Sequence, residues 1–273
     1  VAARLRAQSN ATAAAMQAQM VDRARRLFVD GVGTGHSAIH SQIFPLALGV
    51  VRPESALGQH AFGAIVKHVH AAHAADVPYN FSVYGAALLF RALYACTIDH
   101  GATALEVLTS CGHDSWCHML KAGATATMEA WTRDEKPNLS WSHPWATAPT
   151  AAITHGLVGI RPTAPGFGRF EVQPQPGNLR WASLTLPTVK GIIVVSFNQT
   201  TADFVVRLSM AANMVADAIC LPRLHGDDNI LILDGKEIVG SPRGDYVCAS
   251  RVGSSIAGER TILRKRTERS RLA

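Results

Sequence analysis

Long hydrophobic runs are absent from this sequence of 273 residues. No stretch reaches the roughly 18 uninterrupted apolar residues that a membrane-spanning helix needs. Hydrophobic residues nevertheless make up 48% of the chain and charged residues only 17%, which is ample for a buried core. The composition therefore predicts a globular chain without a membrane partner, holding either one large domain or two of ordinary size.

Acidic residues are scarce: 20 Asp and Glu stand against 26 Lys and Arg, and the net charge is +6. Much of this excess lies at the end of the chain, where residues 259–273 hold six basic and two acidic side chains. The rest of the chain carries a net charge of only +2, which gives no reason to expect a nucleic-acid partner. We predict a basic, disordered tail over residues 259–273, in preference to a nucleic-acid or membrane contact.

Cysteine is also sparse, with five residues at irregular spacing and no Cys-x-x-Cys pair. An odd number without a regular pattern argues against a disulfide framework. Cys111, His113, Cys117 and His118 lie close together in the sequence, but their spacing does not suit tetrahedral zinc. We therefore expect no metal and no cofactor.

The start of the chain gives no targeting signal. It begins at Val1, without a methionine and directly in an Ala-rich helical pattern. A signal peptide can be neither recognised nor excluded at such a start. We expect the sequence to be a fragment of a longer protein, and it leaves open whether that protein is secreted or cytoplasmic.

The hydrophobic periodicity predicts helices first and strands afterwards, an α + β chain. Helical spacing recurs in segments separated by Gly and Pro, and we expect helices at about 1–28, from 36 onward, and at 53–75, 78–95, 101–109, 114–131 and 144–156. Beyond Pro162 the period changes to two, in about seven short strands, and Asp234-Gly235 is a strong turn signal. The chain should divide into a helical part over residues 1–160 and an antiparallel β-sandwich over residues 161–258.

One acidic residue, Glu129, lies in an otherwise apolar and aromatic stretch from Trp116 to Trp131. This stretch is predicted to be helical. A carboxylate in such surroundings is unfavourable unless it is paired or used chemically. Pairing with Arg133 or Lys121, or capping of a neighbouring loop, is the structural alternative, and catalysis is the chemical one.

Two aromatic residues follow shortly after this acid: Trp141 and Trp145, in the segment Ser140-Trp-Ser-His-Pro-Trp145. Indole rings beside a carboxylate suit a sugar, whose C–H faces stack on aromatic planes while its hydroxyls need polar partners. Trp116 and Trp131 are candidates for the same role. For one or two of the four, filling of the hydrophobic core is the alternative.

Three histidines complete the candidate site. His143 either hydrogen-bonds a hydroxyl, orients Glu129, or only caps the helix that begins at Pro144. His36 and His40 lie at positions i and i+4. That spacing suits a metal, but no carboxylate ligand lies nearby in the sequence, so the pair is expected to face a substrate or to be packed.

Several separated motifs resemble, in the same order, the C-terminal half of the family 78 glycoside hydrolases, the α-L-rhamnosidases. They are the segment 36–51, the segment Trp116 to Trp131 with its Gly-Ala-Thr and Glu-Ala-Trp, the Ser-His pair at 142–143, Pro165-Gly-Phe-Gly-Arg-Phe170 and Pro174-Gln-Pro-Gly177. The resemblance covers about residues 27 to 200. One departure is Ala126-Thr127-Met128, where the family usually has Thr followed by a large residue, so the pocket is expected to be altered.

The resemblance implies half of an (α/α)6 six-hairpin barrel followed by the β-sandwich. It further implies inverting hydrolysis of terminal α-L-rhamnosyl residues, with a rhamnosylated oligosaccharide or glycoside as substrate. Glu129 matches the general base, which activates water, while a second carboxylic acid protonates the leaving oxygen. The motif that carries this second acid in the family has no counterpart in this sequence. The resemblance therefore implies that the missing N-terminal half of the parent protein is a partner of this chain and supplies the acid.

A rival hypothesis comes from another class of protein. A chain with one of the two carboxylates would be a catalytically incomplete remnant that binds carbohydrate or serves a structural role. An upstream reading frame that carries the acid motif would favour the enzyme, and a start codon close to Val1 would favour the remnant.

Overall fold

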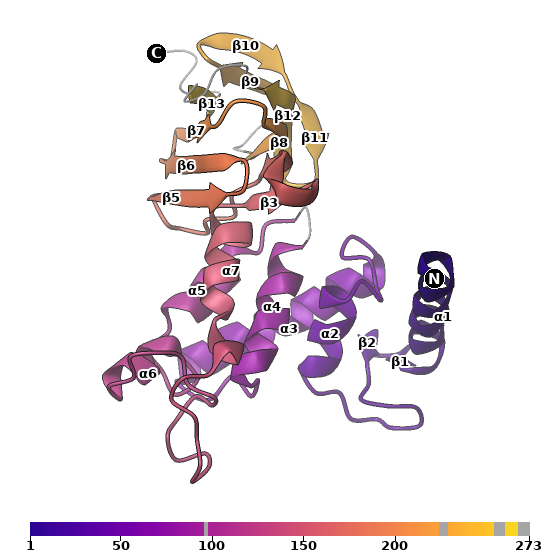
Figure 1. Cartoon of the computed structure of the whole chain (residues 1–273). Coiled ribbons are helices and arrows are strands. Elements are labelled where there is room, and N and C mark those ends of the chain that lie inside the picture. The colour runs from indigo at the N-terminus through magenta and orange to yellow at the C-terminus, as the bar shows by residue number, and fades with distance from the viewer. Residues whose placement is uncertain (96–97, 224–228, 254–259, 267–273) are drawn as a thin grey trace. The chain divides into compact units, whose positions relative to one another are not determined.

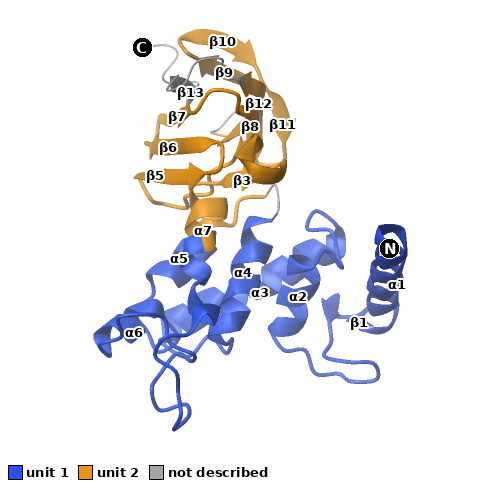
Figure 2. Cartoon of the chain, viewed as in Figure 1, with its two compact units in different colours: residues 1–96, 103–150 blue, residues 97–102, 151–273 orange. Residues whose placement is uncertain are grey.

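Helices come first in the chain and strands later (Figure 1). The computed structural model describes residues 1–95, 98–223, 229–253 and 260–266. They fall into two units: the helical unit comprises residues 1–96 and 103–150, and the β unit comprises residues 97–102 and 151–273 (Figure 2). The α + β class predicted from the periodicity is confirmed.

The helical unit is built from short helices joined by turns. In chain order they are α1 (Ala2–Gln19), α2 (His40–Ala47), α3 (Ala56–Ala75), α4 (Val83–Tyr94), α5 (Gly101–Thr109), α6 (Trp116–Lys121), the 3-10 turn η1 (Pro144–Ala146) and α7 (Ala148–Ala152). A hairpin of β1 (Val21–Asp22) and β2 (Leu27–Phe28) follows α1. Helices α5 and α7 each contain the point where the chain passes from one unit to the other.

Serine residues start three of these helices. The hydroxyl oxygen of Ser55 accepts a hydrogen bond of 3.1 Å from the Gly58 amide, and that of Ser82 accepts one of 3.0 Å from Gly85. Ser115 caps α6 in the same way. Each hydroxyl satisfies one of the amides that have no partner inside the first helical turn, which fixes where the helix begins.

The core of the helical unit lies among α2, α3 and α4. Ile43 of α2, Ile65 of α3 and Leu89 of α4 are fully buried, as expected for the apolar stripe of helices that pack together. Helix α1, by contrast, buries no residue at all. An 18-residue helix without a buried residue gains little stability from packing within the described residues.

Two predicted helices end earlier than their sequence pattern suggests and a third is divided, so these limits are corrected. The first, expected over 1–28, ends at Gln19, and the one expected over 114–131 ends at Lys121. Gly123 follows with φ of 90°, a left-handed conformation that a right-handed helix cannot contain. The segment 144–156 is divided into η1, α7 and the π-helix η2 (Ile153–Leu157).

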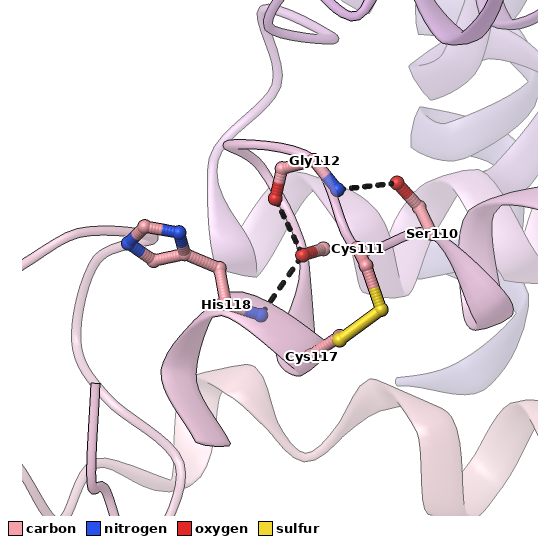
Figure 3. The surroundings of a disulfide bond; sticks show 6 residues. Ser110, Cys111, Gly112, Cys117 and His118 are labelled. Carbon is pink, nitrogen blue, oxygen red and sulfur yellow. Dashed lines mark hydrogen bonds between the residues drawn. A yellow bond between two sulfur atoms is a disulfide. The ribbon is translucent and has the colours of Figure 1, made fainter. Parts of the chain in front are cut away.

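A disulfide between Cys111 and Cys117 closes the turn before α6 (Figure 3). In the same turn the Ser115 hydroxyl donates a 2.6 Å hydrogen bond to the Gly112 carbonyl and accepts the His118 amide. The prediction against a disulfide framework is therefore wrong for this pair of cysteines. The short spacing of six residues gave no regular pattern in the sequence, and only the turn brings the two thiols together.

The β unit consists of two sheets. Its strands are β3 (Ile160–Pro162), β4 (Arg169–Val172), β5 (Trp181–Thr188), β6 (Gly191–Gln199), β7 (Asp203–Met210), β8 (Val215–Pro222), β9 (Ile230–Leu233), β10 (Lys236–Val239), β11 (Ser241–Arg243), β12 (Tyr246–Gly253) and β13 (Arg260–Arg266), with a 3-10 turn η3 (Pro165–Phe167) before β4. One sheet has the order β10-β9-β13-β7-β6-β5 and the other β11-β12-β8-β4-β3. Among the strands that the structure describes, all pairs are antiparallel except β4 with β8.

Alternation of buried and exposed side chains along the strands gives the β unit its core, and this confirms the predicted sandwich. Val195 and Phe197 of β6 and Phe204 of β7 are buried from one sheet, and Ile219 of β8 from the other. A second disulfide joins Cys220 and Cys248, which are direct partners in the pairing of β8 with β12.

Two predictions about turns and ends have different outcomes. Asp234 and Gly235, with φ of 47° and 83°, form the two-residue turn between β9 and β10, as predicted. The disordered tail is corrected in part, because the backbone of residues 260–266 forms β13 between β7 and β9. The rest of the predicted tail, residue 259 and residues 267–273, lies outside the described residues.

Neither a membrane helix nor a metal cluster is found in the described part of the chain. None of the helices described is both long and apolar enough to cross a bilayer. Within the same residues, no group of three His, Cys, Asp or Glu side chains is placed to hold a metal ion.

Candidate functional site

Glu129 lies on a loop, not on the helix predicted for it. The loop is closed by backbone bonds from the Glu129 amide to the Ser140 carbonyl (3.0 Å) and from the His143 amide to the Thr127 carbonyl (2.7 Å). The Thr127 hydroxyl donates a further 2.7 Å bond to the His143 carbonyl. Residue 127 is therefore paired with residue 143, and residue 129 with residue 140. Residues 130–139 form the loop between the paired positions.

The carboxylate of Glu129 has two partners on this loop. Lys136 donates from Nζ to Oε1, and the Ser140 amide donates a 3.0 Å hydrogen bond to Oε2. The Lys136 ammonium is the main cause, and the Ser140 amide the second, of a pKa of Glu129 below its ordinary value. Glu129 is therefore held ionised, and its partner is Lys136 instead of the Arg133 or Lys121 suggested by the sequence.

An ionised carboxylate with two hydrogen bonds retains the capacity for chemistry. Each carboxylate oxygen has two lone-pair positions, so Oε1 and Oε2 can each accept another hydrogen bond. A general base must be deprotonated and within hydrogen-bond reach of the proton that it removes. Glu129 meets the first condition, and its side chain is 22% exposed, so a water molecule can reach it.

His143 lies beside Glu129, and its positive form would further lower the pKa of that carboxyl. The Nε2 atom of His143 is buried and has no hydrogen-bond partner among the described residues. A buried polar atom without a partner is unfavourable by about 1–3 kcal/mol. His143 precedes η1 and makes no side-chain cap there, so the capping alternative is not the observed one.

Trp145 extends the cluster to the surface. Its ring meets that of His143 edge to face, with centroids 4.8 Å apart and planes at 87°. The Trp145 ring also meets that of Tyr84, with centroids 5.7 Å apart and planes at 55°. The side chains of Trp145 and Tyr84 are 58% and 53% exposed. Tyr84 carries no signal in the sequence, because nothing distinguishes an exposed Tyr near the start of a helix from a packed one.

His40 reaches the same end of α4. A side chain added at Gly85, the neighbour of Tyr84, would approach Nε2 of His40 to 3.3 Å. Burial lowers the pKa of His40, which favours the neutral imidazole. His36 points elsewhere, since its Nδ1 pairs with the carboxylate of Asp30 in an exposed position. The two histidines therefore do not act as a pair.

Of the four candidate sugar-stacking residues, Trp131 fills the hydrophobic core, which was the alternative for one or two of them. Trp131 is 3% exposed, and its Nε1–H donates a 2.6 Å hydrogen bond to the Phe81 carbonyl. Trp116 packs edge to face on it, with centroids 4.9 Å apart, and donates to the Ala146 carbonyl. Trp131 has no free face for a ligand. Trp116 keeps partial exposure and lines a groove.

That groove has a volume of about 330 Å³ and is largely apolar. It is lined by Trp116, Met119, Leu120, Ala124, Thr125, Ala126, Thr127, Thr147, Pro149 and Thr150. Thr127 also closes the Glu129 loop, so the groove and the loop adjoin. Trp141, the remaining candidate, is 39% exposed on the loop, with the guanidinium of Arg133 over its ring at 5.9 Å.

The structure thus gathers Glu129, His143, Trp145, His40 and Tyr84 near the first turn of α4. A carboxylate beside a histidine and exposed aromatic rings is an arrangement that suits a sugar. Residues 2–155 match the bacterial α-L-rhamnosidase six-hairpin glycosidase domain, and residues 159–229 match the bacterial α-L-rhamnosidase C-terminal domain. The chain belongs to the bacterial α-L-rhamnosidase family, which confirms the resemblance found in its motifs.

Individual relatives are similar to this chain over part of their length. An α-L-rhamnosidase of Alteromonas sp. (strain LOR) is 27% identical over 122 residues, which are 42% of this chain and 13% of that protein. The chain therefore spans about an eighth of the length of this relative.

Solved structures show the same fold over nearly the whole chain. The α-L-rhamnosidase from Dictyoglumus thermophilum aligns with a TM-score of 0.74 and 18% identity, over 93% of this chain and 28% of that one. The Streptomyces avermitilis α-L-rhamnosidase in complex with L-rhamnose aligns with a TM-score of 0.66 and 18% identity, over 93% and 23%. At this identity the likeness supports the fold alone.

Proposed function

We propose that this chain is part of a longer α-L-rhamnosidase, which hydrolyses terminal α-L-rhamnosyl residues with inversion, and that Glu129 is its general base. The observation that carries the proposal is the Glu129 carboxylate, whose pKa is lowered by its hydrogen bonds to Lys136 and Ser140, beside His143 and the exposed ring of Trp145. The substrate class, a rhamnosylated oligosaccharide or glycoside, follows from family membership.

In this mechanism Glu129 takes a proton from a water molecule as the water oxygen forms a bond to the anomeric carbon. The bond from that carbon to the leaving oxygen breaks on the opposite face, and the leaving oxygen takes a proton from a second carboxylic acid. Lys136 keeps Glu129 ionised and ready to accept the proton. Trp145 and Trp141 offer stacking faces for the sugar, and His143 offers a ring nitrogen for a hydroxyl.

The second acid is assigned to the N-terminal half of the longer protein. The chain spans 28% of the Dictyoglumus structure, and α1 buries no residue within this chain. A helix without buried residues needs a packing partner to be stable. We propose that the missing half covers α1, completes the barrel and supplies the acid, and that residues 1–160 and 161–258 are a barrel part and an assisting sandwich.

A catalytically incomplete, carbohydrate-binding remnant is the alternative function. The observation that favours it is that both oxygens of Glu129 bind groups of its own loop, Lys136 and Ser140. Such bonds also suit a purely structural carboxylate that closes the loop. The chain by itself is expected to be inactive under either proposal, because it lacks the acid motif.

The test is the substitution Glu129→Gln in the full-length protein, assayed with an aryl α-L-rhamnoside. Loss of a general base should lower the rate on the order of 10²–10⁴-fold. Glu237→Gln on the exposed strand β10 is the matched control and should keep the parent rate. An unchanged rate in the Glu129 variant would rule out the base role. Binding of L-rhamnose without turnover by the parent protein would favour the remnant.

A further inference from the structure

Tyr84 and Trp145 are aromatic residues in contact that remain more than half exposed. Their side chains are 53% and 58% accessible although their centroids are 5.7 Å apart. Nearby aromatic residues of the same unit, Tyr79, Phe81 and Phe90, are 2–3% exposed. Burying two large rings is favourable, so an adjoining pair left open to solvent marks a surface where something else binds.

Both rings are carried by rigid elements. Tyr84 is the second residue of α4, whose start is fixed by the Ser82 cap. Trp145 lies in η1 next to Ala146, which is fully buried and accepts the indole N–H of Trp116 at 2.7 Å. A binding surface whose rings are already held in position loses little entropy when a ligand arrives.

The pair is also close to the proposed base. Trp145 meets His143 edge to face at 4.8 Å, and the His143 amide is bonded to Thr127, two residues before Glu129. The two ring planes stand at 55° to each other, so they form two sides of a shallow corner instead of one flat stack. A ligand bound in this corner would lie against Trp145, which contacts His143, and His143 lies beside Glu129.

We propose that Tyr84 contacts the substrate and that its ring, with that of Trp145, forms an apolar wall for the terminal 6-deoxyhexose. This inference rests on the proposed rhamnosidase function and adds a specificity-determining residue to it. A 6-deoxy sugar presents a methyl group and C–H faces, which gain from aromatic contact. The corresponding 6-hydroxy sugar would bury a hydroxyl against the ring faces, which offer its oxygen no hydrogen-bond donor.

Another occupant of the corner is the part of the longer protein outside this chain. In that case Tyr84 and Trp145 would be covered by protein, and substitution of Tyr84 would change stability without changing which sugar is preferred. An apolar pocket discriminates against an added hydroxyl by up to about 10²-fold. The ratio of activities on two sugars that differ in this hydroxyl therefore separates the two occupants.

The experiment compares Tyr84→Ala and Tyr84→Phe in the full-length protein, with aryl α-L-rhamnoside and aryl α-L-mannoside as substrates. For Tyr84→Ala we expect KM for the rhamnoside to rise about tenfold with little change in kcat, and the ratio of kcat/KM values to fall about tenfold. Tyr84→Phe, which keeps the ring, should retain both values. Trp181→Ala, at a 66% exposed tryptophan of β5, controls for loss of an exposed ring.

A rhamnoside to mannoside ratio that stays within about twofold of the parent value in Tyr84→Ala would overturn the inference. If the melting temperature falls at the same time, the corner is covered by protein. These results leave the proposed function intact as long as the parent protein cleaves the rhamnoside and Glu129→Gln does not. A parent protein that cleaves neither substrate overturns both proposals.

Discussion

The indole N–H of Trp131 donates a 2.6 Å hydrogen bond to the carbonyl oxygen of Phe81. The two rings also meet edge to face, with centroids 6.4 Å apart. Phe81 directly precedes Ser82, the cap of α4, and Trp131 is two residues beyond Glu129. The bond therefore ties the Glu129 loop to the end of α4 that carries Tyr84, and the site depends on a contact between segments fifty residues apart.

Removing this bond should reduce stability. Trp131→Phe leaves the Phe81 carbonyl without its donor in a buried position, which is expected to lower the free energy of unfolding by about 1–3 kcal/mol. Urea unfolding followed by circular dichroism measures the change. Trp141→Phe, at a 39% exposed ring, is the control and should change stability by less than about 0.5 kcal/mol. Equal stability of both variants would contradict the interior role of Trp131.

Lys136 should set the acidic limit of activity. Its ammonium is the main cause of the lowered pKa of Glu129, and the base must be ionised to act. Lys136→Met raises that pKa, so as pH falls the full-length protein should lose activity at a higher pH than the parent. The pH dependence of kcat/KM on an aryl α-L-rhamnoside measures the shift. Lys190→Met, on the exposed turn between β5 and β6, should leave the limit in place.

If the acidic limb of the kcat/KM profile is the same in Lys136→Met as in the parent protein, Glu129 is not the group that titrates there. A loss of activity at every pH, without a shift of the limb, would instead mean that Lys136 contacts the substrate.

Asp30 should stabilise the turn before α2 in a pH-dependent way. Its carboxylate accepts hydrogen bonds from the Ser41 hydroxyl (2.6 Å), from His36 and from the Ala38 amide (2.8 Å), which lower its pKa from 3.8 to about 2, with Ser41 the largest cause. Because the folded pKa is below the unfolded one, this stabilisation is fully present above about pH 4 and is lost as pH falls through about 2.

Asp30→Asn should therefore have a lower melting temperature than the parent at pH 6, and the difference should disappear near pH 2. Thermal unfolding at a series of pH values measures this convergence. Asp134→Asn, at an exposed position of the Glu129 loop, is the matched control. A difference that is constant with pH would show that the charge of Asp30 is not what stabilises the turn.

Gly101 should be intolerant of a side chain. A Cβ at this position would lie 2.3 Å from the carbonyl oxygen of Gln175, so the backbone of the β unit would have to move. Gly101→Ala is expected to destabilise the β unit by about 1–3 kcal/mol, as over-packing does. Gly63→Ala in α3, where nothing lies within 4 Å, should be neutral or stabilising by up to about 1 kcal/mol. Thermal unfolding of the two variants tests the difference in sign.

Local patterns in the sequence determined the kind of most elements. The change of hydrophobic period near residue 160 predicted helices before strands, since burial of one face imposes that period directly. Asp234-Gly235 predicted its turn because both residues tolerate positive φ. The family motifs likewise lie within short segments, which is why Glu129, His143 and Trp145 could be selected before their arrangement was known.

Only the tertiary structure decided what these residues do in space. Whether Trp131 faces a sugar or the core depends on Phe81, fifty residues away, and the exposure of Tyr84 depends on Trp145. Glu129 lies on a loop instead of the predicted helix, because Gly123 ends the helix and Lys136 and Ser140 bind the carboxylate. Periodicity reports which face of an element is buried, but it carries no information about the distant group that buries it, and those contacts fix the site.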